Sequence, residues 1–319
     1  MPSEWCKEDK HMRIVFMGTP EFAVTALERI CAAGHEVLSV YTQPDKPKGR
    51  SGKPAPSPVK LCAMEKKLPV LQPEKLREKE NAEQLRSLAP DMIVVAAYGQ
   101  ILSEEILSIP RLGCVNIHAS LLPKYRGAAP IERSILDGEK KTGVTTMMMA
   151  KGLDTGDILE QAETEILPTD TGESLTLRLS EMGGELILST MEKLEKGELT
   201  PVPQKEEDSS YAKMLNKEMG LLDFSRPAVE LERTIRALIP WPCAYTMLEG
   251  KQMKLLEAEI VEASGESGTI TEVTKKSFTI ACGEKGLRIK KIQPEGKKPM
   301  DTAAFLNGNH LAPGVKLGE

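Results

Sequence analysis

The first apolar run of the chain is Arg13-Ile14-Val15-Phe16-Met17, which ends at Gly18-Thr19-Pro20. A short apolar run that stops at turn residues is typical of a buried parallel strand. The turn also predicts a helix start, with Thr19 as N-cap, Pro20 as the first helical residue and an acidic Glu21 in the first turn. We expect this helix to run through Ala32. The stretch therefore predicts a strand followed directly by a helix.

The same alternation repeats as far as His118. Further strands are expected over Val37 to Thr42, around Val70, over Asp91 to Ala97 and over Gly113 to Ile117. Helices are expected from Ser57 to Lys67, from Glu74 to Leu88, after a Ser103 cap and from Gly172 to Lys196. Alternating strands and helices predict a doubly wound, Rossmann-like α/β fold with a parallel sheet, in which ligands bind beyond the carboxyl ends of the strands.

The first turn argues against a dinucleotide cofactor. Gly18-Thr19-Pro20-Glu21 lacks the second and third glycines of the GxGxxG fingerprint. Without them the backbone cannot approach a pyrophosphate closely. We therefore expect this turn to have a structural role or to contact a different substrate.

The sequence predicts two domains. Residues 1–11 form a polar extension, 12–197 a catalytic domain, 198–216 a solvated linker and 217–319 a second domain. In this last part, closely spaced short strands with glycine turns follow one helix, from about Pro227 to Leu238. Such a pattern predicts a small OB-like β-barrel.

Composition excludes several classes of protein. The 319 residues are 40% hydrophobic and 28% charged, with a net charge of −5, which argues against indiscriminate nucleic-acid binding. The six cysteines form no CxxC pair and only four histidines are present, so we predict reduced thiols, no disulfide framework and no metal site. No signal peptide or membrane span is visible. We expect a cytoplasmic monomer with no membrane partner.

The strongest candidate for chemistry is Asn116-Ile117-His118, at the end of an expected strand. Alternate strand residues point to the same face, so the amide of Asn116 and the imidazole of His118 should project together. An amide donor beside an imidazole suits a developing oxyanion. Asp154 lies in a glycine-flanked loop, and a carboxylate beside an imidazole orients the ring. These three residues could run acyl transfer without a covalent nucleophile.

Two basic segments are candidates for phosphate contacts. Residues 43–60 carry five basic side chains (Lys46, Lys48, Arg50, Lys53 and Lys60) against a single acidic one, Asp45. A second group is Lys285, Arg288, Lys290, Lys291, Lys297 and Lys298. Basic side chains clustered on a loop or a small barrel indicate contact with a nucleic-acid backbone, although a solvated surface is the alternative for both.

Eight short segments carry a resemblance to a known family. They are Phe16 to Ala23, Thr42 to Asp45, Pro56 to Lys60, Ala97 to Gly99, Asn116 to Arg133, Gly143 to Thr145, Gly152 to Asp157 and Ile239 to Pro242. Together they resemble the methionyl-tRNA formyltransferases over nearly everything from Met12 onward. The Asn-x-His-x-Ser-Leu-Leu-Pro core alone resembles folate-dependent formyltransferases in general. Ala119 stands where many relatives have glycine, and residues 1–11 have no family counterpart.

The resemblance implies a formyl donor, 10-formyltetrahydrofolate, and an acceptor, the amine of methionyl-initiator-tRNA. By this resemblance Asn116, His118 and Asp154 match the family's catalytic trio. Our hypothesis is that Asn116 and a protonated His118 donate hydrogen bonds to the oxyanion, with Asp154 holding His118. Implied folate-binding residues are Ser120, Leu121, Leu122, Pro123, Tyr98 and Gly99. The tRNA-binding candidates are Lys46, Lys48, Arg50 and Lys53 in the first basic segment, and Lys290 and Lys291 in the second.

Three other functions fit parts of the sequence. The same trio could formylate a nucleotide sugar or a purine precursor, but such an acceptor explains neither the basic loop nor the second domain. A formyltransferase scaffold could act as a non-catalytic RNA-binding protein, which an intact trio disfavours. In a formyl-folate hydrolase, water would replace the amine.

Overall fold

The structure is a computed structural model, and it describes residues 11–47 and 52–318. The described chain divides into two compact units. The first comprises residues 11–126, 143–164 and 177–211, and the second comprises 127–142, 165–176 and 212–318. Within the described ranges, no helix is both long and apolar enough to cross a membrane.

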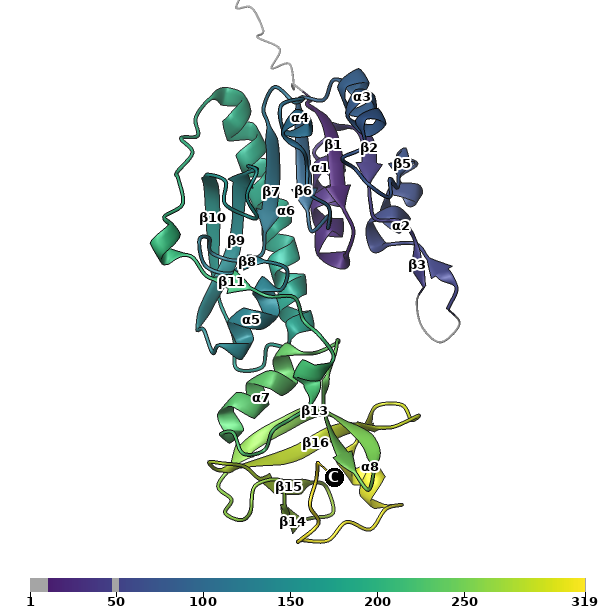
Figure 1. The fold of residues 1–319 in the computed structure, drawn as a ribbon, viewed down its shortest axis with the longest axis vertical. Coiled ribbons are helices and arrows are strands. Elements are labelled where there is room, and N and C mark those ends of the chain that lie inside the picture. Colours follow the sequence, from purple (N-terminus) through teal and green to yellow (C-terminus); the bar gives the residue numbers. More distant parts are fainter. Residues whose placement is uncertain (1–10, 48–51, 319) are drawn as a thin grey trace, which may run out of the picture. The chain divides into compact units, whose positions relative to one another are not determined.

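The first unit is built on a seven-stranded sheet of described residues, in the order β10-β9-β7-β6-β1-β2-β5 (Figure 1). Neighbours from β7 to β5 pair in parallel, whereas β9 pairs with β7 in the antiparallel direction. The doubly wound α/β fold is confirmed, but the sheet is mixed and not fully parallel. The strands are β1 (Arg13–Gly18), β2 (Glu36–Tyr41), β5 (Val70–Leu71), β6 (Met92–Ala96), β7 (Cys114–His118), β9 (Lys141–Met148) and β10 (Ile158–Glu165).

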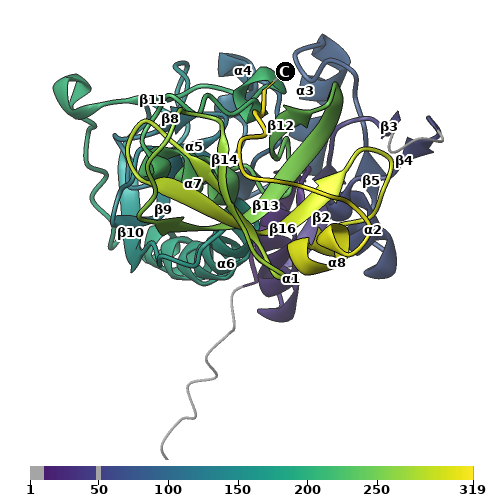
Figure 2. The ribbon, with the colours of Figure 1, turned by 90° about the horizontal axis from the view of Figure 1, so that it is seen from below.

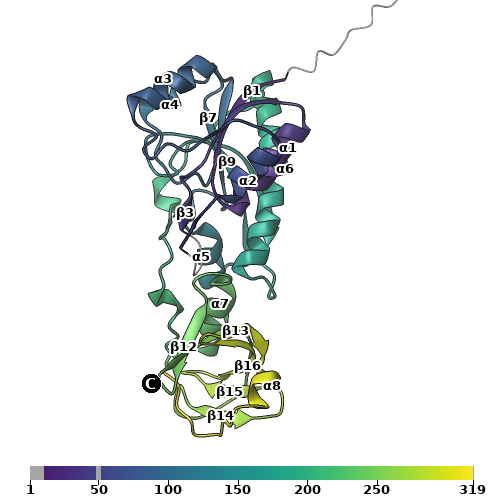
Figure 3. The ribbon, with the colours of Figure 1, turned by 90° about the vertical axis from the view of Figure 1, so that its right-hand side faces the viewer.

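Helices cover both faces of this sheet. Figure 3 shows α1 and α6 on one side and α3 and α4 on the other. On the α6 side, a Cβ added at Gly183 would lie 2.9 Å from the Ile117 side chain, so glycine allows α6 to approach β7 closely. The helices are α1 (Val24–Ala32), α2 (Pro58–Glu65), α3 (Lys79–Leu88), α4 (Glu104–Leu107) and α6 (Gly172–Lys196).

The helix caps at Ser57 and Ser103 are confirmed, since each hydroxyl accepts a backbone N–H of its helix. Thr19 is not an N-cap. Pro20 occupies that position before a short 3-10 turn, η1 (Glu21–Ala23), and the Thr19 hydroxyl donates to the Tyr98 carbonyl at 3.0 Å. The helix expected from Glu74 begins only at Lys79, and the Leu76 amide instead donates to Gln100.

The second unit contains a six-stranded antiparallel sheet with the path β12-β13-β16-β15-β14 and β17 paired to β16, counted over the described residues. The long strands β13 and β16 lie side by side (Figure 2). Its core includes Phe278, Ile280, Leu287 and Ile289, with α7 packed on β13. This confirms the predicted small β domain. Its elements are α5 (Pro130–Leu136), α7 (Ala228–Ala237), β12 (Ala244–Leu248), β13 (Lys251–Val261), β14 (Ile270–Val273), β15 (Phe278–Ala281), β16 (Gly286–Pro294), β17 (Met300–Asp301), α8 (Thr302–Leu306) and the 3-10 turn η3 (Glu218–Gly220).

Candidate active site

The candidate site lies at the carboxyl end of β7. Asn116 and His118 are both buried there, with 8% and 5% of their surfaces exposed. They alternate with Ile117, so they share the face of the sheet opposite to α6. Because β7 lies between β6 and β9, strands on both sides fix its backbone. The expected placement of the amide and the imidazole is therefore found in the structure.

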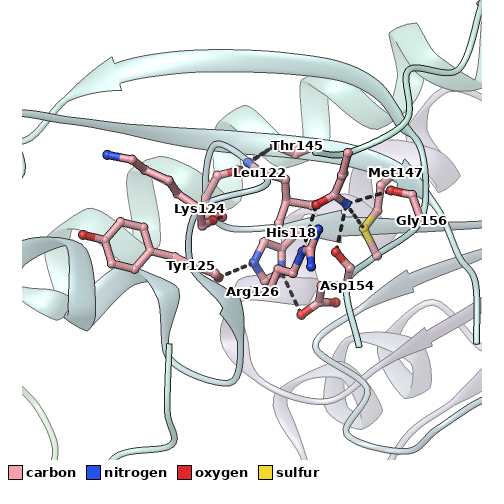
Figure 4. Close-up of polar contacts among 11 residues, drawn as sticks. His118, Leu122, Lys124, Tyr125, Arg126, Thr145, Met147, Asp154 and Gly156 are labelled. Atoms are coloured by element: carbon pink, nitrogen blue, oxygen red, sulfur yellow. Dashed lines mark hydrogen bonds and ion pairs between the residues drawn. The ribbon is translucent and has the colours of Figure 1, made fainter. Parts of the chain in front are cut away.

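The imidazole of His118 is oriented by a main-chain carbonyl. Its Nε2 lies 2.8 Å from the Tyr125 carbonyl oxygen (Figure 4). A carbonyl can only accept a hydrogen bond, so Nε2 carries the proton. Nδ1 then faces Asp154, and its distance to Oδ2 is 3.7 Å. The structure brings His118 and Asp154 together, but Tyr125, which sequence reasoning did not predict for this role, provides the hydrogen bond to the ring.

A strained loop presents Asp154. Its backbone has a φ of +52°, in the left-handed region, between β9 and β10. Gly156 is required by close approach, since an added Cβ would lie 1.6 Å from the Met148 carbonyl oxygen. The amide nitrogen of Gln204 donates to the carbonyls of Asp154 and Gly156 at 2.8 and 2.7 Å. The carboxylate is therefore held by a backbone that is itself anchored.

The loop after β7 is a compact turn held by β9 and β10. The Thr145 hydroxyl donates to the Ser120 carbonyl at 2.6 Å and accepts the Leu122 amide at 3.1 Å. Gln161 on β10 donates to the Leu122 carbonyl. The Ser120 hydroxyl donates to the Lys124 carbonyl, so it has a structural partner within the loop. Leu122 is 3% exposed and Leu121 and Pro123 are partly exposed, which places the predicted folate-binding segment beside His118.

Tyr98 and Gly99 follow β6 at the same edge of the sheet. The Tyr98 ring is packed in the core with Met17, Tyr41 and Leu85, and burial raises the pKa of its hydroxyl. Its carbonyl accepts hydrogen bonds from Thr19 and Gln43. Any contact of this loop with a ligand must therefore come from the main chain and not from the phenol.

The described part of the first basic segment contains a short pair of antiparallel strands. Lys46 lies on β3 (Lys46–Pro47), which pairs with β4 (Pro54–Ala55), and Lys46 and Lys53 are exposed. Lys48 and Arg50 lie outside the described residues. Lys60 belongs to a different group: its ammonium lies 2.7 Å from Asp45 and also donates to Gln72. Its charge is thus neutralised within the fold, which lowers the positive charge expected for this segment.

The second basic group extends from Lys285, just before β16, to Lys298, just after it. Three of its members form ion pairs: Lys290 with Glu259 at 3.1 Å, Lys285 with Glu262 and Arg288 with Glu272. Lys291 is exposed. Nearby carboxylates therefore offset much of the positive charge that the sequence suggested.

Sequence reasoning missed a segment that contacts the site. Residues 201–211, which we call the strap, were expected to be part of a solvated linker over 198–216, and most of them are exposed, but the strap also makes specific contacts with the sheet. Val202 exchanges two backbone hydrogen bonds with Ile158 at 2.8 Å, and β11 (Tyr211–Ala212) pairs with β8 (Arg126–Gly127). The strap includes the 3-10 turn η2 (Glu206–Asp208). The polar composition of the strap predicts a solvated linker. It cannot reveal these contacts, because the residues that the strap pairs with are distant in sequence.

Arg126 lies beneath the strap and is only 1% exposed. Its Nε donates to Gln204 at 3.0 Å and its Nη1 to Glu206 at 2.6 Å. Burial lowers the pKa of the guanidinium, but the hydrogen bonds and charges of Glu206 and Tyr211 together outweigh this, so the pKa is raised overall. The hydrogen bond from Arg126 lowers the pKa of Glu206. Arg126 is therefore a structural cation under the strap.

Comparison with known proteins identifies the family. Family models described as "Formyl transferase" and "Formyl transferase, C-terminal domain" match residues 12–191 and 214–310. The methionyl-tRNA formyltransferase of Lachnospira eligens is 50% identical over 315 residues, which cover 97% of this chain and 100% of that protein. The chain belongs to the methionyl-tRNA formyltransferase family. Another member, from Geobacter sulfurreducens, is 48% identical over 308 residues, 97% of each chain.

A more distant structure shares the fold. HypX from Aquifex aeolicus, solved in complex with tetrahydrofolic acid, superimposes with a TM-score of 0.65 at 19% identity. The match covers 94% of this chain and 47% of HypX. The α/β sheet and the following β domain of the methionyl-tRNA formyltransferase family therefore recur within a longer protein.

Proposed function

We propose that this protein transfers the formyl group of 10-formyltetrahydrofolate to the amine of methionyl-initiator-tRNA, giving N-formylmethionyl-tRNA for translation initiation. The observation that carries the proposal is the pair of His118 and Asp154, 3.7 Å apart, in which the buried His118 shares β7 with Asn116 and the partly buried Asp154 comes from the loop between β9 and β10. The family relatives are enzymes of this name and match the full length of the chain.

The proposed catalytic residues are Asn116, His118 and Asp154. As the amine attacks the formyl carbon, negative charge develops on the formyl oxygen, and the Asn116 amide is a donor for it. One such donor is commonly worth ~3–4 kcal/mol. A new C–N bond forms to the amine, the C–N bond to the folate nitrogen breaks, and a proton moves from the amine to that nitrogen.

The ring geometry suggests which atom handles this proton. Nε2 of His118 is engaged by the Tyr125 carbonyl, so Nδ1 is the nitrogen that can exchange a proton. Asp154 faces Nδ1 and stabilises the charged ring. This refines the expectation from sequence, since Asp154 acts on the charge of the ring while Tyr125 sets its orientation.

The proposed folate-binding residues are Ser120, Leu121, Leu122, Pro123, Tyr98 and Gly99. Their fit to a folate is supported by the position of both loops at the carboxyl edge of β6 and β7, where such sheets bind ligands. Leu121 and Pro123 offer apolar surface, whereas Ser120 and Tyr98 would contribute through the main chain.

The proposed tRNA-binding residues are Lys46, Lys48, Arg50 and Lys53 around the β3–β4 hairpin, and Lys290 and Lys291 on β16. Exposed lysines at the hairpin support the first group. The ion pair of Lys290 with Glu259 makes the second group the weaker contributor. We also propose a monomer, with a catalytic domain over 12–197, a linker over 198–216 and a β-barrel over 217–319.

The test is direct formylation. The protein is incubated with 10-formyltetrahydrofolate and methionyl-tRNA, charged initiator against charged elongator, and formylmethionine is measured. The expected result is formylation of the initiator species. Formyl-folate consumption without tRNA formylation would indicate a hydrolase, and formylation of an amino sugar instead of tRNA would indicate a small-molecule acceptor. Either outcome would overturn the proposal.

A further inference from the structure

The strap contacts both loops that carry the catalytic geometry. Its residue Gln204 contacts the loop of Asp154, and its residue Ser210 contacts the segment that orients His118. Neither residue touches the imidazole or the carboxylate by these bonds. Because they act on the backbones that hold the two groups, they are candidates for positioning residues.

Both the nitrogen and the oxygen of the Gln204 side-chain amide form hydrogen bonds. The nitrogen donates to the carbonyls of Asp154 and Gly156, and the oxygen accepts from Arg126. The two donated bonds therefore hold Asp154, which has a left-handed backbone, and Gly156, which lies in close contact with Met148. The accepted bond fixes which end of the amide is nitrogen, since guanidinium can only donate. Gln204 therefore joins the Asp154 loop to a buried cation.

Ser210 supports the other side of the site. Its hydroxyl accepts the Tyr125 amide at 2.9 Å, and its carbonyl accepts the Arg126 amide at 2.8 Å. Tyr125 has a φ of +60°, a conformation that a non-glycine residue adopts only under constraint. Its carbonyl is the acceptor for Nε2 of His118. A change at Ser210 would therefore be transmitted to the imidazole through one residue.

We infer that Gln204 and Ser210 are positioning residues that set the separation and orientation of His118 and Asp154. The inference rests on the proposed function for its kinetic consequence. At 3.7 Å, Nδ1 and Oδ2 lie beyond hydrogen-bond distance but within the range of an ion pair. A misplacement of about 1 Å in such a site can cost on the order of a hundredfold in rate.

The first test is Gln204→Glu, which keeps the shape and the acceptor for Arg126 but removes both N–H donors. Its kcat should fall roughly tenfold or more, while KM for each substrate stays within about twofold. The matched control is Asn81→Ala, which removes an amide-to-carbonyl bond to Lys75 on the surface of the same unit and should leave kcat unchanged. Wild-type kcat in Gln204→Glu, or an equal loss in Asn81→Ala, would overturn the inference.

The second test needs no substrate. The chain has four histidines, so the ring nitrogens of His118 can be followed by ¹⁵N NMR and assigned by substitution. Ser210→Ala should shift the Nε2 resonance of His118, and Ser210→Thr, which keeps the hydroxyl, should restore it. An unchanged resonance in Ser210→Ala would contradict the inference. Since a wild-type protein that formylates no tRNA would refute only the proposed function, the two failures are distinguishable.

Discussion

The catalytic site and the basic surfaces use polar side chains in opposite ways. At the site, His118 and Arg126 are nearly fully buried and each contacts a defined partner. On the β3–β4 hairpin and on β16, the lysines are exposed or paired with carboxylates at the surface. Buried polar groups act through fixed geometry, whereas exposed charges act through a screened field. Single substitutions should therefore matter much more at the site.

The largest expected effect is that of His118→Ala. Removing a group that transfers a proton in the transition state typically costs on the order of 10²–10⁴ in rate. We expect kcat for tRNA formylation to fall by that range, with tRNA affinity unchanged, as measured by steady-state kinetics and by direct tRNA binding. Near-wild-type turnover would show that His118 takes no part in catalysis. It would also contradict the expectation that substitutions at the buried site matter more than those on the basic surfaces.

Among the substitutions proposed here, Arg126→Leu should cause the largest loss in the free energy of unfolding. It breaks the bonds to Gln204 and Glu206, and a hydrogen bond to a charged group contributes about 1.5–3 kcal/mol. We expect a loss of about 2–3 kcal/mol in the free energy of unfolding, measured by urea denaturation. Arg86→Leu is the matched control, because its 2.7 Å pair with Glu105 is exposed and should contribute under ~1 kcal/mol. Equal losses in the two variants would contradict the account.

The sequence predicted those features of the fold and the site that depend on local patterns. Strand-turn-helix alternation predicted the sheet from β1 to β7, and the spacing of Asn116 and His118 predicted their shared face, because both depend on local periodicity. The antiparallel β9, the role of the Tyr125 carbonyl and the contacts of the strap were missed. Each depends on partners far apart in the chain, such as Arg126 and Gln204, and no local pattern records such a pair.

Arg50→Ala should have a moderate and salt-dependent effect. Arg50 lies outside the described residues, and its proposed role rests on the basic composition of residues 46–53. We expect KM for tRNA to rise roughly tenfold at low salt and the difference to shrink as salt increases, with folate affinity unchanged. Lys290→Ala should change KM by less than about twofold, since Glu259 offsets its charge. An effect of Arg50→Ala that is equal at all salt concentrations would refute phosphate contact.

The smallest effect concerns Lys60 and Asp45. The hydrogen bond from Lys60 lowers the pKa of Asp45 below its usual range. A carboxyl with a depressed folded-state pKa adds stability above its unfolded value, ~3.9, and this contribution is lost as pH falls through the folded value. Lys60→Met should therefore reduce the melting temperature at pH 7 slightly and weaken its decline below about pH 4. If the melting temperatures of wild type and Lys60→Met fall in parallel below pH 4, the pairing of Lys60 with Asp45 is contradicted. Unchanged kinetics with tRNA in Lys60→Met would confirm that Lys60 has a structural role.

The central claim is that the Asp154 carboxylate, which faces Nδ1 of His118, is needed for fast formyl transfer because it stabilises the charged ring. The most direct measurement is the single-turnover rate of N-formylmethionyl-tRNA formation by wild type and by Asp154→Asn, with both substrates saturating. Asparagine keeps the size of the side chain and removes its charge. We predict product formation by the wild type and a loss of on the order of a hundredfold or more in the variant. Equal rates, or no formylated tRNA from the wild type, would contradict the account.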